Sequence, residues 1–298
     1  MWFLLALLAL SMLVARRSTE KHVAGRTDAL VLSWLQQAIA LPFILVTLFF
    51  ARFYWPSELP TSFWITMAVY VVLISIDIYC YFKALSIADV SYIAPLMTLV
   101  AIGNIAGAYI VLGQKPTIFG LAGALLIVCG AVLTYRAKKR EGTQLRANNV
   151  ALLLVLLLVV VRSINSNIEV NMLRVSNPTT FNFYSSVLAV PVLLGTSLMV
   201  IATNKSKGFR NYWKTVHYDV TKQQWLLLFI GLTYTVNMLA TYQAKILSPN
   251  AGYIGAIKSA SVLPMMLVGA ILYKEKIYKS QWLGLGVILI GLVLLALN

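Results

Sequence analysis

The sequence predicts an all-α integral membrane protein with ten transmembrane helices in two inverted five-helix repeats. Hydrophobic residues make up 60% of the 298 positions and charged residues only 11%, far from the balance of a soluble domain. The apolar residues fall into runs of about 20, the length that a helix needs to cross a bilayer. The strands of a membrane β-barrel would be shorter and would alternate polar with apolar residues, which these runs do not. Finally, the second half of the chain repeats the pattern of the first.

The ten apolar runs are separated by short polar segments such as WPSELPTS at 55–62 and RAKKREGTQLRANN at 136–149. The first run, MWFLLALLALSMLVARR, lacks the basic start of a signal peptide, so it is assigned as the first membrane helix. Most connections are short, so neighbouring helices should run antiparallel. The expected spans are 2–21, 29–51, 62–84, 90–112, 117–136, 148–172, 180–202, 224–246, 251–273 and 280–297.

The internal repeat is visible at two fixed shifts. Residues 92–133 align without a gap on residues 253–294 at a shift of 161, and the earlier part of the chain aligns at a shift of 149. A longer loop, NKSKGFRNYWKTVHYDVTKQQ, absorbs the difference between the shifts. The matched pairs are Lys115 with Lys276, Gly123 with Gly284, Gly130 with Gly291, Glu20 with Glu169 and Pro42 with Pro191. Five helices is an odd number, so the two halves should cross the membrane in opposite senses, as in many secondary transporters. The expected domains are 1–137 and 148–298, joined by a linker over 138–147.

Two pairs of segments carry a family resemblance. They are FKALSIADVSYIAPLM with LGQKPTIFGLAGALLIVCGAVL, and LSPNAGYIGAIKSASVL with YKEKIYKSQWLGLGVILIGLVLL. With these segments the chain resembles the drug/metabolite transporter superfamily in its ten-helix, EamA-type form. The resemblance implies an exporter or exchanger of metabolites, with the fifth and tenth helices peripheral and the other eight around a central cavity. It does not choose a substrate. This chain departs from the family pattern at Gln114, where Glu is common, and at Ala256, which faces Pro95 in the alignment.

Three charged residues lie deep within the expected spans: Asp77, Arg162 and Lys258. A charge near the bilayer centre costs about 2.5–3.5 kcal/mol on insertion scales, so these side chains should face the protein interior or water. Their repeat counterparts are apolar, so the fold itself does not require them. One interpretation is that Arg162 and Lys258 bind an anionic group of the substrate near the midplane, with Asp77 pairing in the empty state. The alternative is that Asp77 forms a permanent buried ion pair with one of the two cations.

Further polar residues join this candidate substrate site. Ser166 and Glu169 share a helical face with Arg162, although a polar face also serves contacts between helices. Tyr234 and Asn237, deep in the eighth span, are the best aromatic and amide candidates for the site. Asp77 and Glu169 are the candidate proton carriers.

Two other features of the spans have simpler interpretations. Lys83 and Lys245 lie at span ends, where snorkelling to the interface explains them and a role in binding is the alternative. Gly103 and Gly107 form a small-xxx-small spacing that predicts close helix packing.

The net charge of +15 arises mainly from Lys and Arg in the connections, a pattern typical of membrane orientation and of contact with anionic lipids, so no nucleic-acid partner is expected. The two cysteines and two histidines have no metal-site spacing, and no metal or other cofactor is expected. No phosphate-binding loop occurs, which argues against ATP as the driving force.

The favoured function is therefore a secondary active transporter of a small polar metabolite, an amino acid or another anion, working by alternating access. A flippase for a lipid or lipid-linked precursor is the alternative. A membrane-embedded enzyme is disfavoured, because the spans contain no histidine and Asp77 has no acidic neighbour in sequence. The expected location is the plasma (inner) membrane of a bacterium or archaeon, and a monomer is the working expectation.

Overall fold

A computed structural model describes residues 1–24, 29–88, 93, 96–140, 149–203, 209–273 and 279–297, and every regular element in these ranges is helical. The α-helices are α1 (Trp2–Ala24), α2 (Ala29–Leu48), α3 (Thr61–Ile87), α5 (Leu99–Leu112), α6 (Ile118–Arg140), α7 (Asn149–Val175), α8 (Pro178–Thr203), α9 (Phe209–Leu247), α10 (Gly252–Ser259), α11 (Val262–Tyr273) and α12 (Lys279–Ala296). A short 3-10 helix, η1 (Pro56–Glu58), lies in the connection between α2 and α3.

Within the described residues, six helices are long and apolar enough to cross a membrane: α1, α2, α3, α7, α8 and the part of α9 from Val220 onward. Shorter apolar helices cover 99–112, 118–134, 252–268 and 281–296. A helix satisfies its backbone hydrogen bonds internally, which is the requirement for a segment surrounded by lipid.

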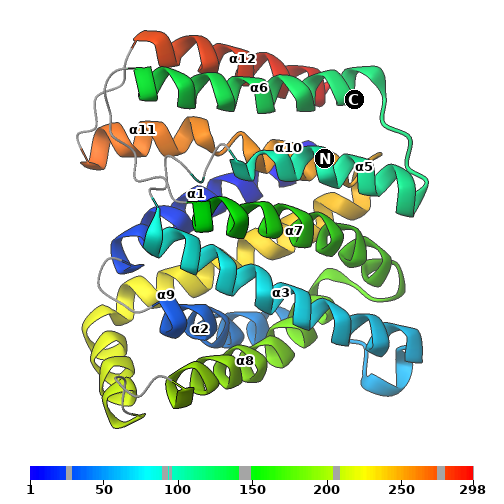
Figure 1. The fold of residues 1–298 in the computed structure, drawn as a ribbon. Helices are drawn as coiled ribbons and strands as arrows, with labels where there is room; N and C mark the ends of the chain where they lie inside the picture. The colour runs from blue at the N-terminus through cyan, green and yellow to red at the C-terminus, as the bar shows by residue number, and fades with distance from the viewer. Residues whose placement is uncertain are drawn as a thin grey trace.

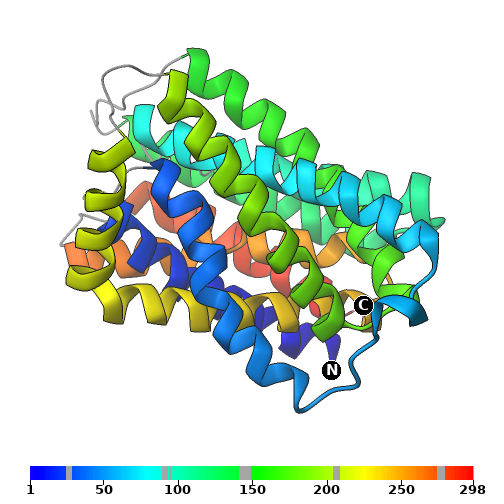
Figure 2. The same ribbon diagram turned by 90° about the horizontal axis from the view of Figure 1, so that it is seen from below.

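The helices stack in layers, with α6 and α12 together at one edge of the bundle (Figure 1). Below them lie α5, α10 and α11, then α1 and α7, then α3 and α9, with α2 and α8 at the opposite edge (Figure 1). The edge position of α6 and α12 agrees with the peripheral place expected for the fifth and tenth spans. Two perpendicular views place both chain ends at the same end of the bundle (Figures 1 and 2).

Glycines bring α6 and α12 into backbone contact. A Cβ atom at Gly123 would lie 2.8 Å from the carbonyl oxygen of Gly291, and one at Gly130 would lie 2.6 Å from that of Gly284. Any side chain at these positions would push the helices apart. The sequence alignment pairs Gly123 with Gly284 and Gly130 with Gly291, so each glycine faces the repeat partner of the other, as a two-fold relation requires.

The same reciprocity holds for the helix contacts across the bundle. The helix α1 packs on α9 while α3 packs on α7, and α2 packs on α9 while α3 packs on α8. The first three helices of one half, α1, α2 and α3, are equivalent to α7, α8 and α9 of the other. Replacing each helix by its equivalent therefore turns the first contact of each pair into the second. The pairs α2 with α8 and α6 with α12 are unchanged by that replacement.

Two expected elements differ from the structure. The span 251–273 is broken between Ser259 and Val262, because the chain turns at Ala260 and Ser261. The loop expected before the eighth span is helical from Phe209, and the non-helical backbone of Gln223 kinks it into the membrane part of α9. Tyr92 and Pro95, which the repeat alignment used, lie outside the described residues.

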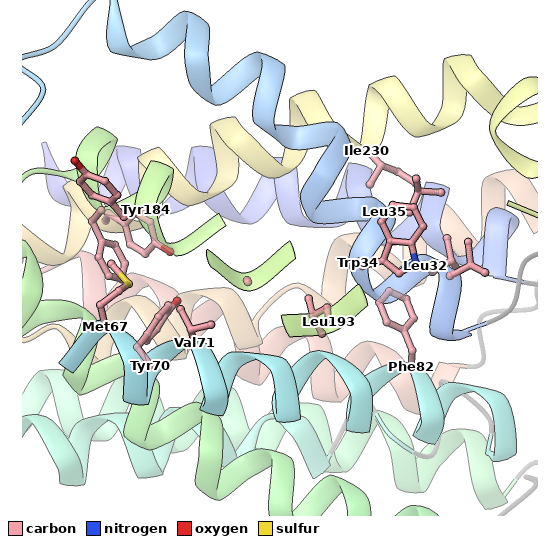
Figure 3. Packing of buried hydrophobic residues seen from close by; sticks show 14 of the residues in the cluster. Leu32, Trp34, Leu35, Met67, Tyr70, Val71, Phe82, Tyr184, Leu193 and Ile230 are labelled. Atoms are coloured by element: carbon pink, nitrogen blue, oxygen red, sulfur yellow. The ribbon is translucent and has the colours of Figure 1, made fainter. Parts of the chain in front are cut away.

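The largest apolar cluster gathers at two levels along α3 (Figure 3). Met67, Tyr70 and Tyr184 meet at one level, and Phe82 lies at the other level with Trp34 and its neighbours (Figure 3). Tyr70 and Phe82 are twelve positions apart, which is about 18 Å along the helix. Asp77 lies on α3 between these levels, so the polar groups described next belong to the middle of the bundle.

Candidate functional site

Asp77 and Arg162 form a two-pronged ion pair between α3 and α7. The Arg162 Nε donates to Asp77 Oδ1 at 3.0 Å, and its Nη2 donates to Oδ2 at 2.9 Å. The guanidinium also lies over the Tyr81 ring, 5.7 Å from the ring centroid. The Asp77 side chain is only 6% exposed, whereas that of Arg162 is 29% exposed. The structure therefore joins two predicted site residues and leaves the Arg162 side chain partly exposed.

Glu169 and Lys245 form a second ion pair, between α7 and α9. The ammonium of Lys245 also donates to Ser166 Oγ at 2.8 Å, and the Tyr70 hydroxyl donates to Glu169 Oε1 at 3.0 Å. The Lys245 side chain is 5% exposed. The interpretation of Lys245 as a snorkelling residue was wrong, because its helix turns this side chain toward Glu169 in the protein interior.

Lys258 lies in the last turn of α10, directly before the break in the helix. Its Nζ donates to Thr241 Oγ1 of α9 at 3.2 Å. The Thr241 hydroxyl in turn donates to the backbone oxygen of Asn237 at 2.7 Å. In the part of the chain that the structure describes, no carboxylate lies within ion-pair distance of Lys258.

The helix α1 contributes three charged residues that the sequence analysis left out of the site. Arg16 and Glu20 pair at 3.2 Å, one turn apart. Arg17 Nη1 approaches Ser261 Oγ, in the break between α10 and α11, at 3.5 Å. The match of Glu20 with Glu169 in the repeat was a signal that could have placed Glu20 here.

Tyr234 and Asn237 tie α9 to the first half of the chain. Gln37 Nε2 donates to the Tyr234 hydroxyl at 3.0 Å, and the Arg16 guanidinium lies 5.2 Å from the centroid of the Tyr234 ring. The Asn237 Nδ2 donates to the backbone oxygen of Ala9, and its side chain is fully buried. Both predicted residues therefore lie inside the bundle, in contact with α1 or α2.

The polar face of α7 serves two purposes. Ser163 and Asn167 fill the space beside Gly103 and Gly107 of α5, where an added Cβ would lie 2.1 Å from Ser163 Oγ or from Asn167 Nδ2. This confirms the predicted close packing at the glycine pair. The other side of the face carries Arg162, Ser166 and Glu169 toward α3 and α9. The residues that pack against α5 and the residues of the charged cluster thus lie on neighbouring sides of α7.

The described cluster holds five cations and three carboxylates. Each carboxylate has a cationic partner, in the pairs Arg16–Glu20, Arg162–Asp77 and Lys245–Glu169. Arg17 and Lys258 have only hydroxyl partners there, Ser261 and Thr241. An arginine supplies a planar fork and a lysine a compact charge, and both suit a carboxylate or phosphate. Among the described residues, no group of three or more His, Cys, Asp and Glu side chains could hold a metal ion.

Comparison with known proteins gives a family and a fold. A model of the EamA-like transporter family matches residues 1–136 and again residues 149–297. A solved crystal structure, titled only as that of a protein, superposes with a TM-score of 0.68 over 99% of this chain and 96% of the other. The two sequences are 13% identical, so this likeness concerns the fold alone. No curated protein matches the sequence.

Proposed function

Because the chain belongs to the EamA-like transporter family, whose members move small solutes across membranes and are not enzymes, we propose that it is a secondary active transporter of an anionic or zwitterionic metabolite. The observation that carries the proposal is the pair of interior cations, Lys258 and Arg17, that lack a carboxylate partner among the described residues. In a multi-pass membrane protein such charges are expensive unless they serve a solute or an ion path. An amino acid carboxylate or a phosphate would supply the missing counter-charge.

The proposed mechanism is alternating access by export or exchange, with ten spans in two inverted repeats around the charged cluster. The reciprocal helix contacts and the glycine contacts between α6 and α12 support this arrangement. Support also comes from the helix breaks. The first half also has a turn near the equivalent position: Thr98, which matches Ser259 at the shift of 161, is the turn residue before α5, one residue ahead of the position that matches Ala260. Transporters of this plan bind solutes at interrupted helices near the midplane.

Within this mechanism the predicted residues have separate roles. We propose that Lys258 contacts the anionic group directly, and that Arg162 does so through its exposed part while Asp77 holds it. Glu169, held between Lys245 and Tyr70, is the proposed proton carrier together with Asp77. Protonation of either carboxylate would release its cation toward the solute.

The test uses the purified protein in liposomes and in detergent. Amino acids, sugar phosphates and nucleotide sugars are screened for thermal stabilisation and for counterflow. Lys258→Met, which installs the residue found at the equivalent Met97, should fold and lose the response to the active anion. Lys115→Met is the matched control, because it removes an exposed lysine from the connection after α5.

Two results would contradict the proposal. Unchanged binding and transport in Lys258→Met would make this lysine structural. Movement of a fluorescent lipid across the same liposomes, without uptake of any solute, would instead favour the flippase alternative.

A further inference from the structure

A second group of polar side chains lies beside the charged cluster and is uncharged. We propose that Gln37, Asn182 and Ser186 form, with Tyr234, a hydrogen-bonding subsite for the uncharged part of the transported solute. The chemistry that fits is a hydroxyl or amide group on a solute whose other end is anionic. This inference rests on the proposed function and names a second recognition element of the same solute.

The subsite is defined by atoms without partners. Gln37 Oε1 and both amide atoms of Asn182 are buried and have no hydrogen-bond partner among the described residues, and Ser186 Oγ has no neighbour of that kind besides the Tyr234 hydroxyl. The three residues are at most 2% exposed. Buried polar groups in folded proteins are nearly always hydrogen-bonded, and lipid cannot supply the partner. Partners for these atoms have to come from water or from a bound solute, and we propose the solute.

Tyr234 brings the two sides of this subsite together. Gln37 of α2 donates to its hydroxyl at 3.0 Å, and Ser186 of α8 lies beside the same hydroxyl. Gln37 and Ser186 are equivalent in the repeat at the shift of 149, and their helices pack on each other. The subsite therefore lies where the two halves meet. Asn182 is one turn before Ser186 on the same face of α8, about 6 Å along the helix.

Two neighbouring hydroxyl groups, those of Ser185 and Thr235, do have partners. The Ser185 hydroxyl, buried next to Ser186, donates to the backbone oxygen of Asn182 at 3.1 Å. The Thr235 hydroxyl donates to the backbone oxygen of Gly231 at 2.9 Å. Own-helix bonds are thus available to hydroxyls in this layer, whereas Ser186 makes no such bond. Other buried atoms without a partner lie elsewhere among the described residues, for example on Asn104 and Asn165, but only Gln37 and Ser186 are grouped around the Tyr234 hydroxyl.

One face of α9 connects the subsite to the anion-binding lysine. Tyr234, Asn237 and Thr241 follow each other at three- and four-residue spacings, and Thr241 accepts from Lys258. Asn237 Oδ1 on this path is also buried without a partner. Tyr234 and Thr241 are seven positions apart, which is about 10 Å along the helix. A solute that reaches both ends is longer than a simple amino acid and carries its hydrogen-bonding groups away from its charge.

The test compares solutes that share an anion and a ring but differ in hydroxyl groups. Glucuronate is paired with cyclohexanecarboxylate, and glucose 6-phosphate with cyclohexylmethyl phosphate. Binding is measured by thermal stabilisation for the full-length wild type, Ser186→Ala, Asn182→Leu and the control Ser185→Ala. Wild type and control should prefer the hydroxylated member of at least one pair by about tenfold. Ser186→Ala and Asn182→Leu should bind both members equally, with unchanged affinity for the apolar one.

The outcomes separate the two proposals. If wild type binds anions but does not discriminate within a pair, or if both variants keep the preference, the unpartnered atoms hold only water and the subsite is refuted. If wild type binds no member of either pair, the proposed function fails for these anions and the subsite fails with it. Ser186→Ala removes a single oxygen atom, so where Asn182→Leu does not fold, a preference retained by Ser186→Ala alone refutes the subsite.

Discussion

The ion pair between Asp77 and Arg162 offers the sharpest test of how charge is held in this bundle. The repeat itself supplies the substitutions, because the counterpart of Asp77 is Met238 and that of Arg162 is Leu13. Asp77→Met leaves a guanidinium without its carboxylate, and Arg162→Leu leaves a buried carboxylate without its guanidinium. The double variant places in one layer the two apolar residues that the other half already uses.

The magnitudes follow from burial. Removing one partner of a buried ion pair costs about 3–5 kcal/mol, because the remaining charge stays desolvated. Arg162 is 29% exposed and Asp77 only 6%, so the orphaned arginine is less deeply buried than the orphaned aspartate. We therefore expect a loss near the lower end of that range, about 3 kcal/mol, for Asp77→Met and near its upper end, about 5 kcal/mol, for Arg162→Leu. The double variant should lose about 1 kcal/mol, since apolar replacement of a whole buried pair is close to neutral.

The assay is equilibrium unfolding in mixed micelles for the wild type and the three variants. Losses that add up in the double variant would refute the reasoning, because they would mean that the two charges do not stabilise each other. Counterflow with the same proteins then separates the two interpretations of the pair. A stable double variant without transport assigns the pair to the solute, and one with full transport assigns it to the fold.

Two further predictions concern packing and pH. Gly284→Ala should lower stability by about 1–3 kcal/mol, because its Cβ would lie 2.7 Å from the Gly130 carbonyl oxygen. Gly286→Ala on the same helix meets open space and should be neutral or stabilising. Thermal unfolding of both variants checks this prediction, and equal effects would contradict it. The hydrogen bond from the Trp55 backbone N–H lowers the pKa of Glu58, in the connection before α3. The stabilisation that the Glu58 carboxylate provides should therefore be present at neutral pH and lost as the pH falls through that lowered pKa. On acidification, the unfolding temperature of Glu58→Gln should fall less than that of the wild type.

The helical fold follows from the sequence because lipid leaves the backbone few choices. Long apolar runs must be helices, and glycines at regular spacings indicate where two helices touch. The break at Ala260 and Ser261 was not predictable in this way, since neither residue is a glycine or proline. The helix that begins at Phe209 was missed for a different reason. Its first turns are charged and aromatic, so a search for apolar spans passes over them.

The candidate site was predictable in its members but not in its pairings. Asp77 and Arg162 are 85 residues apart, so only the packing of α3 on α7 brings them together. Lys245 shows the same limit more clearly. Its place near the end of a span was evident, but the rotation of α9 about its own axis decides whether the ammonium reaches the interface or Glu169.

The polar residues of the interior differ in whether the equivalent position of the other repeat is also polar. Gln37 and Ser186 are equivalent positions and both are polar, as are Glu20 and Glu169. Lys258, in contrast, faces the buried Met97 in the alignment. Polar groups at equivalent positions of the two halves can contact a solute from either half. A charge present in one half alone makes the two sides of the site different. A solute with one anionic and one uncharged end would be held in a single orientation by this combination, because only the second half carries that lysine.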